Sequence, residues 1–272
     1  MVLNDGELIE KVSRIMLEHV EIANHFPKKH MVIGDVDVCT IQYGKGGELL
    51  HRGYHCPSPI RDLIISNINR GKLIRNTSEM FGKNNVNYVY RLNNNGKLIS
   101  VEVIDDFPCI EYIWYDEICQ YGLACAVSEL ENLKKGVDSV RYETISKCLY
   151  DDSGKIITYE LSVPVPNINS SLEIARLYVE EYFYEDELLS KILVYEYFNA
   201  QKVLSSKQNL KSKIEDSLNS RDQYNFIACH KEYYLQRNQD GVAIEYNVID
   251  IVDGKKQNEK AVSLPKSKQR KV

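Results

Sequence analysis

The segment VRYETISKCLYDDSGKIITYEL, residues 140–161, contains two strand-like runs joined by a polar turn. The runs are rich in Ile, Leu and Tyr, and the turn holds Asp151, Asp152, Ser153 and Gly154. β-branched and aromatic residues favour strands, and a turn with Asp and Gly between two such runs is typical of a β-hairpin. The sequence therefore predicts a fold built from β-hairpins.

The same pattern occurs at three other places in the chain. An aromatic-rich arm, a polar turn, and an aliphatic arm with Tyr and one Glu recur at residues 88–103, 182–197 and 233–248. Consecutive hairpins joined by short turns form antiparallel meanders. We expect one or two antiparallel β-meander sheets built from these repeated hairpins.

Segments with helical spacing of apolar residues lie between the hairpins. In the first of them, Asp5 stands where a helix cap belongs, and Leu8, Val12 and Ile15 follow on one helical face. Helices packed on one face of antiparallel sheets make the expected fold class α+β. The predicted helices cover residues 5–26, 58–71, 128–135 and 200–219.

Three domains or segments are expected. Residues 1–80 form a helix-hairpin-helix part, whose hairpin covers residues 32–55. Residues 81–252 form a hairpin-rich body, either separate from the first part or continuous with it, in which residues 171–185 fit a strand and a helix equally well. Residues 253–272 have no apolar period and are expected to be a disordered basic tail.

The charge of the chain is unevenly distributed. The formal net charge is −5, but residues 253–272 hold seven Lys or Arg against two acids, so that residues 1–252 carry −10. An acidic body repels nucleic acid and favours a basic protein partner. Contact with nucleic acid is expected only through the basic tail.

The composition also bears on location and cofactors. There is no run of 18 apolar residues, and the N-terminus carries acids where a secretory signal has a basic start. The seven cysteines are scattered without a CxxC pair, so neither a disulfide framework nor a zinc site is suggested. We expect a cytoplasmic protein without a membrane span, metal or other cofactor.

Seventeen of the nineteen tyrosines lie between residues 86 and 248, and the acids form two clusters. The tyrosines serve either as cross-strand pairs or as an exposed binding face, because Tyr and Trp are frequent in interface hot spots. If the acid clusters lie on one side, they make a negative surface suited to a cationic protein. The candidate partner-binding residues are Tyr112, Trp114, Tyr115, Asp116, Glu117, Glu180, Glu181, Glu185, Asp186 and Glu187.

The segment HRGYHCPSP contains the densest group of reactive side chains. His51, His55 and Cys56 could hold a metal or act in nucleophilic catalysis. Gly53 and Pro57 exclude a helix that would align the two histidines, and there is no HExxH or CxxC motif. We therefore assign no catalytic or metal-binding residue, and a hydrolase-like enzyme that uses these three side chains stays an alternative.

Two turns combine Gly and Lys in the same way. An aromatic arm precedes Gly96 and Lys97 in one hairpin, and Gly154 and Lys155 in another, and aliphatic residues follow in both. This pattern is similar to the YD-type and MORN-like hairpin repeats of bacterial toxin-delivery proteins and their antitoxins. The acidic, tyrosine-rich chain also looks like the immunity proteins of polymorphic toxin systems. The hairpins depart from true repeats, since Gly96, Gly154 and Gly241 lie 58 and 87 residues apart.

The resemblance implies a bacterial, cytoplasmic immunity protein that neutralises a basic toxin domain by protein-protein contact. It assigns no functional residue. Besides the enzyme considered above, a structural module that self-associates through an open edge strand is a further alternative.

Overall fold

The computed structural model describes residues 5–26, 38–48, 51–65, 70–75, 87–104, 106, 108–135, 140–166, 172–199, 225–252 and 255–272. The chain divides into two compact units. The first contains Met1–Asn24 and Ile157–Val272, and the second contains His25–Ile156. The boundary expected near residue 80 therefore falls inside the second unit.

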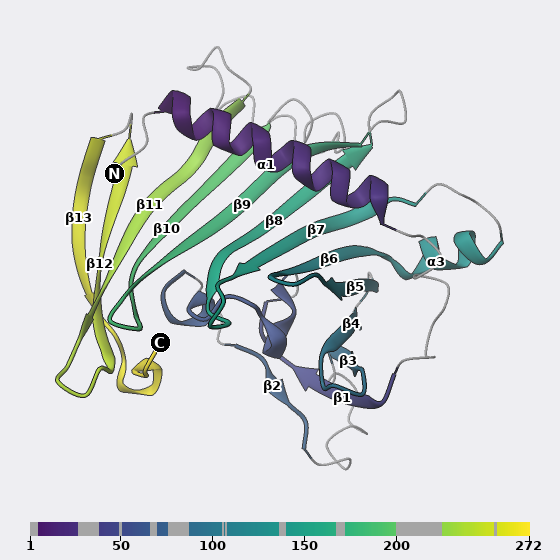
Figure 1. Cartoon of the computed structure of the whole chain (residues 1–272), viewed down its shortest axis with the longest axis horizontal. Helices are drawn as coiled ribbons and strands as arrows, with labels where there is room; N and C mark the ends of the chain where they lie inside the picture. Colours follow the sequence, from purple (N-terminus) through teal and green to yellow (C-terminus); the bar gives the residue numbers. More distant parts are fainter. Residues whose placement is uncertain are drawn as a thin grey trace. The chain divides into compact units, whose positions relative to one another are not determined.

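The first unit is an antiparallel meander with one long helix (Figure 1). The six strands lie in the order β8-β9-β10-β11-β12-β13, so that each strand pairs with its neighbours in sequence. Its elements are α1 (Asp5–His25), β8 (Ile156–Pro166), β9 (Leu172–Glu185), β10 (Leu188–Asn199), β11 (Asn225–Arg237), β12 (Ala243–Val252) and β13 (Lys255–Ser263).

The second unit is also an antiparallel meander, in the order β2-β1-β3-β4-β5-β6-β7. Only β2 departs from the sequence order, because it pairs with the outer side of β1. Its elements are β1 (Thr40–Lys45), β2 (Lys72–Leu73), β3 (Tyr88–Leu92), β4 (Leu98–Val103), β5 (Cys109–Tyr115), β6 (Cys119–Ala126), α3 (Val127–Lys134) and β7 (Tyr142–Tyr150), with a 3₁₀ turn at Gly53–His55 and a π-helical turn at Arg61–Ile65.

The predicted fold class, α+β, is wrong. The described residues form thirteen strands and one main helix, so the chain is nearly all antiparallel sheet. The meander of hairpins agrees with the expectation, whereas the layer of helices does not. The open question at residues 171–185 is settled in favour of strand β9.

Two of the expected helices are present as α1 and α3. In the third expected helix, residues 58–71, the described residues 58–65 and 70–71 are helical only at Arg61–Ile65, which is a single π-helical turn. Ile60 and Leu63, two of the apolar residues of this segment, are buried. The predicted polar helix at residues 200–219 lies outside the described residues.

The hairpin predicted over residues 32–55 is also not formed as expected. β1 pairs with β2 and β3, and residues 51–55 form turns that include the 3₁₀ turn. The tail 253–272 was expected to be disordered, but Lys255–Ser263 forms β13. A hydrophilic sequence can join a sheet edge because the backbone, and not an apolar face, makes the pairing.

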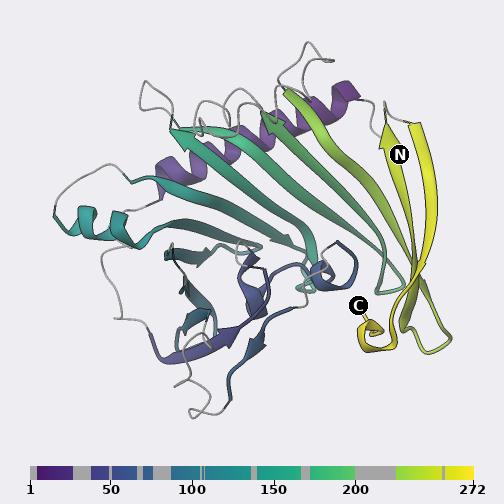
Figure 2. The same ribbon diagram turned by 180° about the vertical axis from the view of Figure 1, so that it is seen from behind.

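Helix α1 is fixed on its sheet by polar contacts to strand residues. Directly paired residues of antiparallel strands share a face, so Glu160, Val179 and Tyr195 lie side by side. His19 Nε2 donates to Glu160 Oε2 at 3.1 Å, and its Nδ1 lies 2.7 Å from Ser162 Oγ, all three side chains being buried. These contacts place the helix on the face that carries Glu160 (Figures 1 and 2).

Lys11 adds a second attachment of α1. It forms an ion pair with Glu181, and its Nζ lies 5.7 Å from the centre of the Tyr195 ring. The apolar residues Leu8, Val12 and Ile15 are buried on the same side of the helix. The amphipathic pattern of the sequence therefore matches the observed packing.

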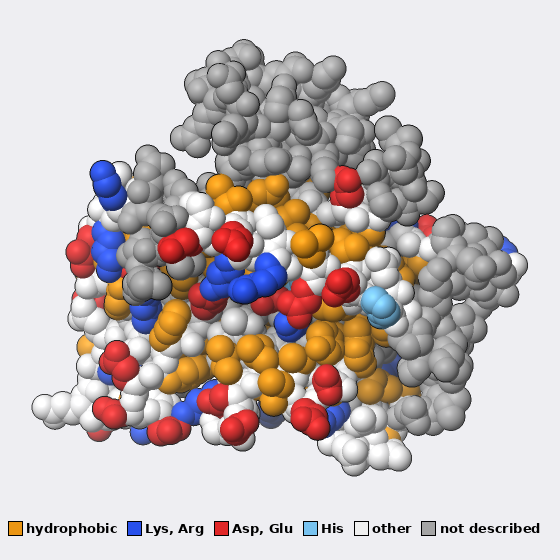
Figure 3. Space-filling model, turned by 45° about the horizontal axis from the view of Figure 1, so that its top comes forward, with side chains coloured by type: hydrophobic (Ala, Val, Ile, Leu, Met, Phe, Trp, Pro, Cys, Tyr) orange, Lys and Arg blue, Asp and Glu red, His pale blue; other side chains and the backbone are white. Residues whose placement is uncertain are grey.

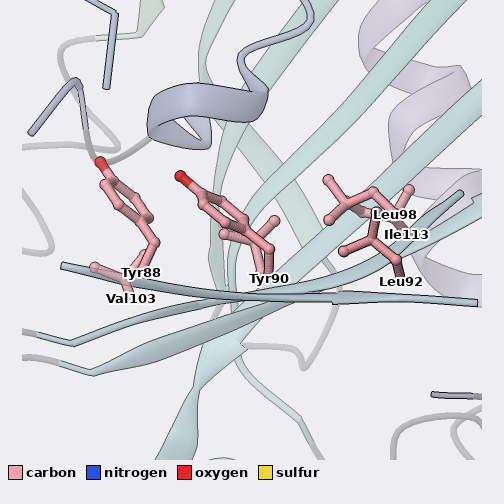
Figure 4. Close-up of a cluster of buried hydrophobic side chains, with 7 residues drawn as sticks. Tyr88, Tyr90, Leu92, Leu98, Val103 and Ile113 are labelled. Carbon is pink, nitrogen blue, oxygen red and sulfur yellow. The ribbon is translucent and has the colours of Figure 1, made fainter. Parts of the chain in front are cut away.

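Side chains of β3, β4 and β5 form a compact apolar cluster in the second unit (Figure 4). Tyr88 and Tyr90 stack at a ring distance of 5.6 Å, and both are fully buried. Gly53 lies against the Tyr88 ring, where a Cβ would come within 2.5 Å of the ring carbons. The other buried members are Leu92, Leu98, Val101, Val103 and Ile113.

The edge strand β13 is attached through a buried carboxylate of β11. Glu232 Oε1 accepts from Lys191 Nζ at 2.6 Å, and Glu232 Oε2 accepts from Tyr234 Oη at 2.7 Å and pairs with Lys256 Nζ at 2.8 Å. Burial alone raises the pKa of a carboxyl group, but these three donors outweigh it and lower the pKa of Glu232 to about 2. Lys256 of β13 is thereby tied to the interior of the sheet.

We predict that Glu232→Gln destabilises the protein by on the order of 2 kcal/mol at pH 7, because the charged form of Glu232 is favoured in the folded state. The pKa of Glu232 is about 2 in the folded state and near 4.5 in the unfolded state, so its ionisation stabilises the folded state at pH values above 4.5. This contribution disappears as the pH falls from 4.5 toward 2. The stability gap between the variant and the wild type should therefore close between pH 5 and pH 2. Urea unfolding across this pH range measures it, and Glu117→Gln, which removes an exposed carboxylate, is the matched control variant.

Candidate functional site

The two histidines of the HRGYHCPSP segment have separate side-chain partners, and Cys56 is contacted at its backbone carbonyl. His51 is buried, with Nε2 3.9 Å from Glu48 Oε1, and His55 Nε2 lies 3.1 Å from Gln42 Oε1. Arg70 donates to the backbone carbonyl of Cys56 at 3.2 Å. Among the described residues no group of three His, Cys, Asp or Glu is arranged to hold a metal ion.

The ring of His55 is held in a tyrosine-lined setting beside two arginines. It packs edge-on against Tyr54 and Tyr90, at ring distances of 5.1 and 4.6 Å. Burial, with the charges of Arg52 and Arg70, lowers the pKa of His55 to about 4. The imidazole is therefore neutral at pH 7, and it serves the packing of this segment.

The same segment contains a buried ion pair that the sequence analysis missed. Arg52 is 2% exposed and has a left-handed backbone, with φ 63°. Its Nε and Nη2 donate to the two carboxylate oxygens of Glu111 at 2.8 and 2.6 Å. Nη1 donates to Gln120 Oε1 at 3.1 Å, and Nη2 also donates to Ser146 Oγ at 2.7 Å.

Three strands supply this arginine site, and a glycine makes room for it. Glu111 lies on β5, Gln120 on β6 and Ser146 on β7. A Cβ at Gly122 of β6 would come closer to Glu111, Arg52 and Ser146 than real Cβ atoms come to other atoms. Glu111 is buried and paired, although several other acids lie near it in the sequence, such as Asp116 and Glu117.

The predicted partner-binding residues of the second unit lie on β5 and the turn after it. Trp114 stacks on Tyr121 at 5.3 Å and contacts Phe26 at 4.5 Å, and it is half-buried. Tyr115 Oη donates to the carbonyl of Leu98 at 2.9 Å, and Tyr112 is half-buried. Asp116 and Glu117 are exposed in the turn.

The predicted residues of the first unit fall into two groups. Glu180 is fully buried and accepts from the hydroxyls of Tyr178 and Tyr182. Glu181 pairs with Lys11 and accepts from Tyr195 Oη. These two acids are therefore bound internally.

The second group consists of Glu185, Asp186 and Glu187, which are all exposed at the turn between β9 and β10. This group and the Asp116–Glu117 turn belong to different units. Glu180 is buried and Glu185 is exposed although both lie on β9. The alternation of residues along a strand could not predict this difference in burial, because it does not show which parts of the strand are covered on both faces.

The comparisons with known proteins give little further information. No family model matches the sequence, and no curated protein matches it. A protein of unknown function from Bacteroides fragilis NCTC 9343 is 14% identical, with 43% of this chain and 84% of that chain covered and a TM-score of 0.28. A porin-like protein from Bacteroides uniformis ATCC 8492 is 10% identical, with 65% and 89% covered and a TM-score of 0.15.

TM-scores this low support no argument about fold or function. In the part of the chain that the structure describes, no helix is both long and apolar enough to cross a membrane. The interpretation of function therefore depends on the surface and on the chemistry of the buried groups.

We predict that Arg52→Met lowers the free energy of unfolding by about 3 to 5 kcal/mol, because it leaves the buried carboxylate of Glu111 without a counter-charge. The double variant Arg52→Met with Glu111→Leu should lose less than the single variant. Arg61→Met is the matched control, since the Arg61–Glu48 pair is more exposed and should contribute less than about 1 kcal/mol. Equal losses for Arg52→Met and Arg61→Met in chemical denaturation would contradict the assignment.

Proposed function

We propose that this chain is a binding protein that holds a basic partner protein by surface contact, in the manner of an immunity protein that neutralises a toxin domain. The observation that carries the proposal is the tip of the β9–β10 hairpin. This tip consists of Phe183, Tyr184, Glu185, Asp186 and Glu187. It combines three adjacent exposed carboxylates with an aromatic side chain that is 44% exposed, Phe183.

One residue of this tip has a backbone conformation that it does not favour. Asp186 and Glu187 form a two-residue turn with φ values of 47° and 69°. A turn with two positive φ values favours Asn or Asp at its first position and Gly at its second, so Asp186 suits the turn and Glu187 costs roughly 1 to 2 kcal/mol. Three successive acids also repel one another. Residues that conflict with local stability are typical of functional sites.

The composition of the tip fits a cationic protein surface. Carboxylates steer a basic partner and fix its orientation, and an exposed aromatic ring supplies apolar contact area. The exposed side of α1 is less one-sided than the tip. Along α1, exposed acids such as Glu10 and Glu21 alternate with bases such as Arg14, and Figure 3 shows both signs close together on that face.

Binding to the protein encoded beside this chain's gene tests the proposal. Calorimetric titration should show a complex, and Glu185→Lys with Glu187→Lys should weaken it by about tenfold or more. Asp152→Lys with Asp240→Lys makes the same change of charge at two other exposed turns, and should leave the affinity nearly unchanged. Equal effects of the two pairs, or no complex with the wild type, would argue against the proposal.

Growth of cells that express the neighbouring protein supplies an independent measure. The wild-type chain should protect these cells if the neighbour is a toxin, and the Glu185→Lys, Glu187→Lys variant should protect them less. Equal protection by the variant would show that the tip is not needed for neutralisation.

We further predict that Asp186→Asn with Glu187→Gly stabilises the chain by about 1 to 2 kcal/mol while it weakens partner binding. Asn-Gly adopts the two positive φ values at little cost, so strain is relieved, but two carboxylates are lost. Thermal or urea unfolding measures the gain. Glu187→Gly alone should show part of it, and a loss of stability in both variants would show that the turn is not strained.

A further inference from the structure

The outer edge of β13 is the surface that carries a further inference, independent of the β9–β10 tip. β13 pairs with β12 alone among the described strands, and it is the last strand of its unit in both ribbon views (Figures 1 and 2). Eight of its nine side chains are exposed, and Val262 is half-buried. Both faces and the outer edge are therefore accessible in the described part of the chain.

The hydrogen-bonding pattern identifies which backbone groups point outward. The N–H of Leu264 donates to the carbonyl of Ile244 at 2.8 Å. Residues opposite each other in an antiparallel pair alternate between bonded and non-bonded pairs. The next bonded pairs are therefore Tyr246 with Val262, and Val248 with Lys260.

It follows that Ala261 and Ser263 direct their N–H and C=O groups away from β12. No described residue accepts or donates a hydrogen bond at these outward groups. The register is regular from Lys260 to Ser263, whereas the irregularity lies between Val248 and Asp250, near Asn258 with its φ of 50°. The regular half of β13 is thus a free sheet edge without a bulge.

The charge around this edge selects the kind of partner. Residues 255–272 contain seven Lys or Arg and one acid, which gives +6, while the rest of the chain carries −11. Lys255 and Lys260 are exposed on the strand itself. A second copy of this edge would bring like charges together, whereas an acidic strand would be attracted.

We propose that β13 accepts an extended acidic segment of another protein, which adds to the sheet as a further antiparallel or parallel strand. The backbone groups of Ala261 and Ser263 supply the hydrogen bonds, and the lysines supply the preference for acidic side chains. Lysines on an edge strand also disfavour pairing with other basic or neutral strands. We therefore expect this edge to distinguish between partner strands by their charge.

Titration with short synthetic peptides tests this proposal. The acidic peptide alternates Glu with Val and Thr. The basic peptide has the same sequence with Lys in place of each Glu. The acidic peptide should bind, and the basic peptide should bind at least about tenfold more weakly. Lys255→Glu with Lys260→Glu should reverse the preference. Equal binding of both peptides, or no binding of the acidic one, would overturn the proposal.

A proline substitution separates edge pairing from simple charge attraction. Ala261→Pro removes an N–H that points outward, so the ladder to β12 keeps its bonds while the added strand loses a donor. Ala261→Val keeps the N–H and is the matched control. The acidic peptide should bind Ala261→Pro about tenfold more weakly than Ala261→Val, and equal affinities would show that it does not pair with this edge.

Amide hydrogen exchange of the wild type gives a measurement that does not depend on how the variants fold. The N–H groups of Ala261 and Ser263 should exchange rapidly in the free protein and slowly with the acidic peptide. Those of Lys260 and Val262 should be protected in both states, since they bond to β12. A dimer of the wild type that Ala261→Pro dissociates, seen by sedimentation, would instead assign the edge to a second copy of this chain.

Discussion

Buried glutamates on the sheets hold the elements that are not part of a hairpin or that lie at an edge. A carboxylate away from water costs several kcal/mol unless a cation or a donor reaches it, so each buried glutamate specifies the position of the group that satisfies it. A displacement of the attached element by one residue would leave the carboxylate unpaired. The anchors are Glu160 with His19 of α1, Glu111 with Arg52 of the loop after β1, and Glu232 with Lys256 of β13.

The hairpins could be predicted from the sequence because their signals are local. The polar turns at Asn93–Gly96, Asp151–Gly154 and Asn238–Gly241 each place Gly where φ is positive, and the arms beside them are strand-forming. The order of the sheet follows from short connections. Features that depend on distant contacts could not be predicted. The apolar spacing of residues 172–185 fits both a helix and a strand, and it is the pairing with β10 that makes this segment a strand.

The anchoring residues show a similar limit. A single Glu in an apolar arm, such as Glu160, is a signal of a buried and paired carboxylate, but the sequence does not name its partner 141 residues away. Arg52 stands between two histidines in a segment without regular structure, and nothing nearby marks it as buried. Glu185, Asp186 and Glu187 are exposed at the β9–β10 turn, within the hairpin predicted at residues 182–197, while Glu180 and Glu181 of the same candidate set are bound inside the unit.

The first unit is formed from two separate segments of the chain, and this affects how it folds during synthesis. Helix α1 precedes the whole second unit, and the strand residues that receive it, at positions 160 and 162, follow that unit. Domains generally fold as units during synthesis, from the N-terminus onward. A ribosome-bound chain therefore carries α1 with its apolar face uncovered while residues 25–156 fold, and the helix docks only when β8 and β9 have emerged. Residues Leu8, Val12 and Ile15, which are buried in the folded protein, therefore stay in contact with water until these strands are made.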